Sequence, residues 1–174
     1  MTTKLSDDFM QRIADEEVWK ELSSEVAWTE ELLEKYQDKV DWNEVSENHH
    51  IMWTVPMLHK FEKKVNWSKL SHELNEDQLT SAIVDAFKDK WDWHELSGNW
   101  DLELTYELID KYIDRWDWKE LISRRGCVSI FDENGITFYE RYKEYIPASH
   151  LQDTNLWTEI VEQRKTQIMN EILS

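Results

Sequence analysis

Histidine and cysteine are the residues of this chain that could do metal or nucleophilic chemistry, and their spacing argues against both. The 174-residue sequence has six His and a single Cys, Cys127. A structured zinc site needs His or Cys pairs at short, fixed spacings. His49 and His50 are adjacent, no His-x-x-x-His pair occurs, and Cys127 has no suitably spaced His. We therefore expect no metal, no cofactor and no catalytic residue, and we expect the histidines to lie at the surface.

Other motifs for catalysis or ligand binding are also missing from the sequence. There is no Gly-rich phosphate loop and no Gly-x-Ser-x-Gly elbow, and Asp132–Gly135 is too short for a calcium loop. Carboxylate pairs are abundant, but a chain with 37 Asp and Glu forms such pairs by chance. The sequence predicts a protein that is not an enzyme. An enzyme of unrecognised type is the least favoured alternative.

Composition limits the partners and the compartment. The 37 acids face 20 Lys and Arg, for a net charge of −17, which repels nucleic acid and anionic lipid. We expect a basic protein partner, no direct nucleic acid and no membrane. No segment approaches the roughly 20 apolar residues of a membrane span, and the start lacks a secretory signal core. The lone Cys permits no intramolecular disulfide, so a cytoplasmic setting is expected.

A repeated hexapeptide organises most of the chain. Asp41–Ser46 (DWNEVS) recurs at 66–71, 92–97 and 117–122, with a degenerate first copy at 18–23. Such a period corresponds to one supersecondary unit. Thirteen residues before each motif Trp lies a Ser or Thr, from Ser6 in the first copy to Thr105 in the fifth. The motif tryptophans, predicted to form the repeat core, are 23 to 26 residues apart: Trp19, Trp42, Trp67, Trp93 and Trp118.

Each copy predicts two helices. The hydroxyl residue is a good N-cap, and positions +3, +4, +7 and +11 after it are apolar, which gives one buried stripe on a three-turn helix. In the second copy this stripe is Leu32, Leu33, Tyr36 and Val40. The Asp and Glu of the hexapeptide then form a capping box for a short helix of α or 3₁₀ type.

Stacked copies of this unit predict an all-α fold, an α-solenoid of about six repeats of 23–30 residues in one domain over 1–174. Two copies depart from the pattern: Val18 replaces the Asp in the first, and in the sixth Gly135 takes the cap position while Ala148 replaces the Trp. The repeats are placed at about 5–27, 28–52, 53–78, 79–103, 104–133 and 134–156, followed by a capping helix at 158–173 that begins after Thr158.

The segment Trp28–Asn48 (WTEELLEKYQDKVDWNEVSEN) resembles the DWxxLS-type repeats of bacterial and viral proteins. The alternation of a longer and a short helix is also similar in architecture to leucine-rich-variant solenoids. The resemblance covers about residues 5 to 160. It implies a helical repeat fold and supplies no catalytic or ligand-binding residue.

The charges follow the repeat. Positions +5 and +9 are mostly acidic and positions +6 and +10 mostly basic, on adjoining flanks of the helix, so we expect ion pairs between neighbouring helices, each worth at most ~1 kcal/mol. Other acids gather at early connectors and first turns, where a one-signed edge steers basic partners. Such an edge serves solubility equally well. The partner-binding candidates on it are Glu25, Glu30, Glu31, Glu44 and Glu47.

Two further regions are candidates for contact with a partner. Trp100 lies outside the repeated apolar slots, and it either contacts a partner or covers a groove between repeats. Arg124 and Arg125 open a connector, residues 123–134, that is about five residues longer than its counterparts. This segment is either a special contact or a tolerated insertion.

These observations predict an interaction module that binds and masks a basic protein, as an immunity or inhibitor protein does. The alternative is a passive scaffold or a homo-oligomeric structural protein. A charge-steered partner would be weakened by salt, which separates the two.

Overall fold

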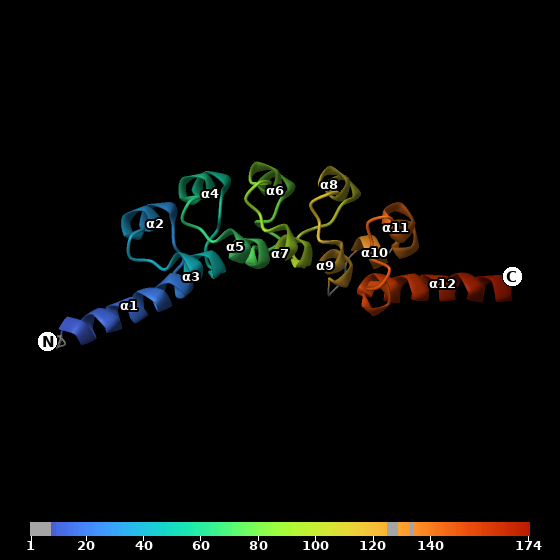
Figure 1. Cartoon of the computed structure of the whole chain (residues 1–174), viewed down its shortest axis with the longest axis horizontal. Helices are drawn as coiled ribbons and strands as arrows, with labels where there is room; N and C mark the ends of the chain where they lie inside the picture. Colours follow the sequence, from blue (N-terminus) through green and yellow to red (C-terminus); the bar gives the residue numbers. More distant parts are fainter. Residues whose placement is uncertain (1–7, 125–128, 133) are drawn as a thin grey trace. The chain divides into compact units, whose positions relative to one another are not determined.

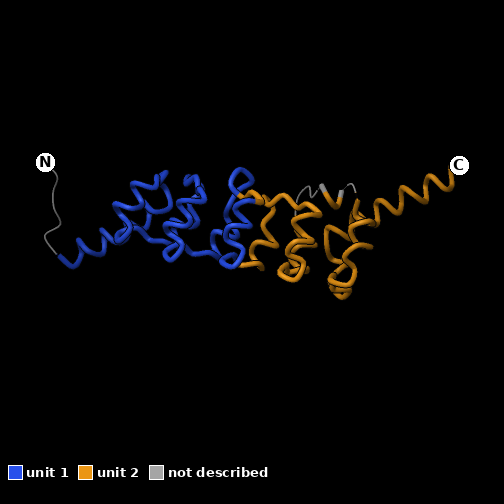
Figure 2. Tube along the Cα trace, turned by 90° about the horizontal axis from the view of Figure 1, so that it is seen from above, with its two compact units in different colours: residues 1–78, 82–91 blue, residues 79–81, 92–174 orange. Residues whose placement is uncertain are grey.

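The computed structural model describes residues 8–124, 129–132 and 134–174. These residues form helices and connecting turns with no strand among them, so the prediction of an all-α fold is confirmed. The chain divides into two compact units, residues 1–78 with 82–91 and residues 79–81 with 92–174 (Figure 2). The single domain over 1–174 stays a prediction.

Unit 1 has two rows of helices (Figure 1). Successive helices of the lower row pack on one another, α1 on α3 and α3 on α5, which is a solenoid-like stack. The lower row consists of α1 (Asp8–Glu25), α3 (Trp42–Glu47) and α5 (Trp67–Glu73). The upper row consists of α2 (Glu30–Tyr36), α4 (Val55–Phe61) and α6 (Ser81–Ala86).

Unit 2 repeats this plan and ends in a longer helix. Its motif helices α7 (Trp93–Gly98) and α9 (Trp118–Ser123) pack on each other. The last helix, α12 (Asn155–Leu173), packs on α11 and α9. The remaining elements are α8 (Tyr106–Lys111), α10 (Ser129–Asp132), α11 (Gly135–Tyr142) and the 3₁₀ turn η1 (Leu151–Asp153).

The hydroxyl caps begin the upper helices as predicted, but these helices are shorter than three turns. The side chains of Thr29, Thr54 and Thr105 each accept a hydrogen bond from the amide three residues on. Helix α2 ends at Tyr36, and the carbonyl of Tyr36 then accepts from the amides of both Lys39 and Val40. Bonds of the i→i+3 type tighten a last turn in this way.

Most of the predicted apolar stripe is buried, but in the second copy Tyr36 is only half-buried and Leu32 is exposed. The +4 residues Leu33, Leu58, Val84 and Ile109 are fully buried, and the +11 residues are buried too. Leu32 at +3 is instead 37% exposed, whereas its counterpart Met57 is 6% exposed. Among the described residues of unit 1, no upper-row helix precedes α2 as α2 precedes α4 (Figure 1), which accounts for the difference between Leu32 and Met57.

The motif helices are α-helices rather than 3₁₀ turns, and an Asp starts most of them. The Asp41 carboxylate, for example, accepts from the amides of Asn43 and Glu44. The motif Trp rings pack on the +7 aromatic ring of the next copy, as Trp42 does on Phe61 with centroids 5.2 Å apart. Trp118 is buried, but the other four are only half-buried: Trp19, Trp42, Trp67 and Trp93.

The last residue of the hexapeptide joins neighbouring copies. Ser46 is buried, its hydroxyl donates to the carbonyl of Trp42 (2.6 Å) and it accepts from the amide of Asn66 (2.9 Å). Ser23 bonds the carbonyl of Trp19 and the amide of Asp41 in the same way. The hydroxyl therefore satisfies the backbone of the next copy at its N-cap, where a buried orphan amide would be costly. The repeated Ser was visible in the sequence, but its role was not predicted.

The first copy does not bend. A second helix beginning at Trp19 was expected, but α1 runs without a break from Asp8 to Glu25. Val18 occupies the position of Asp41 and has no oxygen with which to cap a new helix, so the helix continues. The proposed cap at Ser6 lies outside the described residues.

The last copies begin one to four residues earlier than predicted. Asn134 rather than Gly135 is the N-cap of α11, without a side-chain cap bond. The terminal helix is capped by Thr154, whose hydroxyl accepts from the amide of Trp157, so the predicted start at Thr158 is wrong. Ala148 is exposed, and the short helix of this copy is reduced to η1 around the buried Leu151.

Candidate protein-binding site

An open groove of about 960 Å³ lies in unit 1 between α1 and the segment that links α2 to α3. Residues 8–20 of α1 form one side, and Asp38, Lys39, Val40 and Asp41 form the other. The groove exists because α1 continues straight where the other copies bend back into an upper-row helix. Within residues 8–124, no helix fills the position that an upper helix of the first copy would take.

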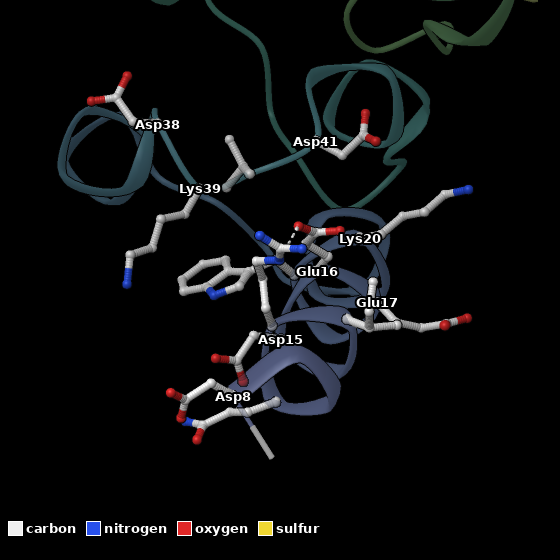
Figure 3. A pocket seen from close by; sticks show the side chains of 13 residues that line it. Asp8, Asp15, Glu16, Glu17, Lys20, Asp38, Lys39 and Asp41 are labelled. Atoms are coloured by element: carbon white, nitrogen blue, oxygen red, sulfur yellow. Dashed lines mark ion pairs between the residues drawn. The ribbon is translucent and has the colours of Figure 1, made fainter. Parts of the chain in front are cut away.

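Acidic side chains predominate around this groove, six carboxylates against three cations. Figure 3 shows Asp8 and Asp15 on the α1 side and Asp38 and Asp41 on the opposite side. The three cations have partners within unit 1: Arg12 lies 4.0 Å from Glu16, Lys20 3.5 Å from Glu44, and the Lys39 ammonium 5.2 Å from the Trp19 ring centroid. Two of the six carboxylates are paired as well, Glu16 with Arg12 and Asp38 with Lys64 (3.4 Å), and the groove keeps an excess of three acids over bases.

The floor of the groove is partly apolar. Trp19 is half-buried, and its ring lies 5.4 Å from Tyr36 and 6.5 Å from Trp28 between centroids. Ile13 is 39% exposed, while Val40 is buried. Apolar side chains beside a mainly acidic rim are what a protein-binding surface offers to an amphipathic partner.

Several acids of the predicted acidic edge form ion pairs with lysines from other copies. Each of three of the five candidate acids is paired with a Lys about one repeat away: Glu30 with Lys60 (2.9 Å), Glu44 with Lys20 (3.5 Å), and Glu47 with Lys69. These lysines are distant in sequence and are brought beside the three acids by the stacking of the copies.

Glu25 and Glu31, the other two candidates, are exposed. The Glu31 carboxylate accepts hydrogen bonds from its own backbone amide and from the Thr29 hydroxyl, and both lower its pKa. Neither residue lines the groove. The acids that do line it on α1, Asp8, Asp15, Glu16 and Glu17, were not singled out from the sequence, because their position depends on the unbroken helix.

The ion pairs expected between neighbouring upper helices are confirmed. Lys60 of α4 lies 2.7 Å from Glu34. Lys64, in the turn that follows α4, lies 3.4 Å from Asp38. In unit 2, Arg141 of α11 pairs with Asp110 of α8. These pairs lie at the surface, where water and salt screen them, so their contribution to the stability of the stack is small.

The other predicted contact residues have different surroundings. Trp100 is largely exposed, as a contact residue requires. Arg124 is buried, donates to the carbonyl of Leu102 (2.6 Å), and burial lowers its pKa to about 10. It follows α9 at the place where buried Asn48 follows α3, so its predicted role as a surface contact is wrong. Arg125 lies outside the described residues.

Among residues 8–124, 129–132 and 134–174, no three His, Cys, Asp or Glu side chains are grouped so that they could hold a metal ion. In the same part of the chain no helix has both the length and the apolar character needed to cross a membrane. Comparison of the sequence and the structure with protein-family models, curated proteins and solved structures gives no match. The resemblance to DWxxLS-type repeats stays a prediction.

Proposed function

We propose that this protein is a non-enzymatic interaction module whose acidic N-terminal unit binds and masks a basic protein surface, in the manner of an immunity or inhibitor protein. The observation that carries the proposal is the groove of unit 1, where six carboxylates and three cations surround the half-buried Trp19 and the exposed Ile13. Because acids outnumber bases two to one in its lining, a bound protein meets mainly carboxylates there.

Charge distribution supports the same surface. Residues 1–46 contain 13 of the chain's 37 acids but only five of its 20 Lys and Arg. Unpaired rim charges act over the Debye length, about 8 Å at physiological salt, and raise the association rate of an oppositely charged partner. Paired acids such as Glu30 and Glu44 contribute less to this field.

The test begins with capture of a partner on the immobilised chain at low and at moderate salt, followed by association kinetics with the purified partner. Neutralising the groove as Asp15→Asn, Glu16→Gln and Glu17→Gln should slow association about tenfold or more at low salt, because such charges act chiefly on the on-rate. The effect should shrink as salt is added.

Glu76→Gln with Asp77→Asn is the matched control. Both residues are exposed acids of unit 1 and neither lines the groove. Equal slowing by the two sets of substitutions, or an association rate that salt does not change, would exclude the groove as the binding surface. The passive scaffold would then be the better hypothesis, and Trp100 the next surface to test.

A further inference from the structure

The first half of α1 carries at the protein surface the residues that the other copies bury. Counted from Ser6, Phe9, Met10 and Ile13 hold positions +3, +4 and +7 of the first copy. In the third, fourth and fifth copies every residue at these positions is buried. In the first copy they are 59%, 52% and 39% exposed. Residues 8–17 therefore have the apolar stripe of an upper-row helix, and exposed apolar surface of this kind marks an interaction site.

The surface that would receive this stripe is exposed on α2. Leu32, at +3 of the second copy, is 37% exposed, whereas the +3 residues of the next three copies are at most 6% exposed. The half-buried Trp19, which packs on Tyr36, forms the floor beside it in the groove of unit 1. In the other copies an upper-row helix stands before this face. The second copy thus has a site shaped for a helix of the repeat.

The charges of the repeat indicate how such a helix would lie there. Lys64, at +10 of the third copy, pairs with Asp38 at +9 of the copy before it. The residue at +10 of the second copy is Lys39, and the residue at +9 of the first is Asp15. Lys39 instead lies over the Trp19 ring, 5.2 Å from its centroid. Docking in the register of the repeat would bring Asp15 beside Lys39, so opposite charges meet although both surfaces carry more acids than bases.

The first copy does not fill this site itself, because α1 is unbroken. Figure 1 shows α1 continuing past α2 rather than turning back toward it. In a continuous helix, Phe9 and Trp19 are about 15 Å apart along the axis. Glu17 and Val18 hold the places at which the second copy has a buried Val and a capping Asp, so the residues that make the bend are missing. Residues 8–17 of a second copy are not restrained in this way.

We propose that the protein forms a reciprocal dimer in which residues 8–17 of each copy dock on α2 of the other, in the place of an upper-row helix. The apolar stripe of the segment packs against Leu32 and the exposed part of Trp19, and Asp15 faces Lys39. Exchange of one element between two identical chains is isologous and closes at two copies. The contact continues the upper row, where ion pairs already join α2 and α4. This inference does not depend on the basic partner, which would compete for the same groove.

Sedimentation equilibrium over a wide range of protein concentration tests the proposal. Physiological salt is needed because the charge of −17 on each copy is repulsive until screened to about 8 Å. The unmodified chain should form dimers and no larger species. Phe9→Ser with Ile13→Ser, and Leu32→Ser alone, should each raise the dimer dissociation constant about tenfold or more, since each change affects both symmetric contacts.

Ile168→Ser with Ile172→Ser is the matched control, because these are exposed apolar residues of α12 in unit 2. It should leave the dissociation constant unchanged. Circular dichroism of every variant checks that the helices are retained.

Exchange of the two charges tests the register of the contact. Asp15→Lys and Lys39→Glu should each weaken the dimer, and both together in one chain should restore it, since Asp15 of one copy meets Lys39 of the other. Net charge alone gives a different result. Asp15→Lys makes the chain less negative and would then strengthen association.

A chain that stays monomeric at all concentrations, or that grows beyond the dimer, would overturn the proposal. So would a dimer that is unaffected by the substitutions at Phe9 and Ile13 or by the substitution at Leu32. Failure of the double charge exchange to restore the dimer would exclude the register. None of these measurements uses a basic partner, so their failure leaves the proposed function standing.

Discussion

The first two copies of the repeat have a Trp in the same place and fold differently before it. In the second copy Asp41 precedes Trp42, accepts two amide hydrogen bonds, and starts a new helix after the turn that ends α2. In the first copy Val18 precedes Trp19 and α1 continues through both positions. One N-cap residue therefore coincides with the difference between a closed repeat and an open groove.

The same difference determines what covers the neighbouring helix. Met57 of α4 follows a complete copy and is buried, whereas Leu32 of α2 follows the unbent copy and is exposed. Both residues occupy the +3 slot of an upper helix in unit 1. Lys60 of α4 pairs with Glu30 and Glu34 of the preceding copy, whereas Lys35 of α2 lies over the ring of Tyr36 in its own copy.

The largest expected effect compares these two +3 residues. Met57→Ala should lower the free energy of unfolding by about 2 to 3 kcal/mol, the cost of removing a buried side chain. Leu32→Ala should cost less than about 1 kcal/mol, since the side chain is already partly in water. Chemical denaturation of both variants measures the difference. Equal costs would mean that α2 is covered as completely as α4.

A smaller effect is expected from the cap itself. Asp41→Ala removes the acceptor of the Asn43 and Glu44 amides and should cost about 1 kcal/mol. Val18→Ala, at the equivalent place inside α1, should change the stability by no more than about 0.5 kcal/mol, as exposed surface substitutions do. Thermal or chemical unfolding distinguishes the two. A cost at Val18 equal to that at Asp41 would show that Val18 has a structural role of its own.

Local rules were sufficient to predict much of this fold. The caps at Thr29, Thr54 and Thr105 follow from residue type alone, and the buried +4 residues follow from helical periodicity. The sequence also shows departures from the repeat at Val18 and Ala148. It did not lead to a prediction of the unbroken helix at Val18 or of the 3₁₀ turn after Ala148. A residue that cannot cap leaves a helix unbroken, and that consequence creates the groove.

The site was harder to predict, because contacts one period apart are invisible along the sequence. Glu44 looked unpaired until stacking placed Lys20 beside it. Arg124 looked like a surface charge but replaces a buried Asn in the array. Asp15 and Glu17 line the groove only because α1 is one unbroken helix. In a repeat protein, residues about one period apart are therefore potential neighbours.

The smallest expected effect distinguishes the residues that follow the motif Trp. In the first copy this residue is Lys20, paired with Glu44, and in the fourth it is His94, whose ring nitrogen lies 2.8 Å from Asp117. The hydrogen bond to Asp117 raises the pKa of His94. Burial opposes ionisation of Asp117, but hydrogen bonds from His94 and from the amides of Glu120 and Lys119 lower its pKa overall.

Because its pKa is higher in the folded state, His94 stabilises the protein fully below its unfolded pKa of about 6.5. This contribution is lost as the pH rises through the folded pKa. Asp117 contributes above its unfolded pKa of about 3.9 and loses this contribution as the pH falls through its lower folded value.

The free energy of unfolding, measured by urea denaturation from mildly acidic to mildly basic pH, should therefore decline across the titration of His94. His94→Gln should reduce that decline, while His50→Asn, at an exposed His of unit 1, should not. An unchanged pH profile in His94→Gln would show that the Lys20 and His94 positions are equivalent in their effect on stability.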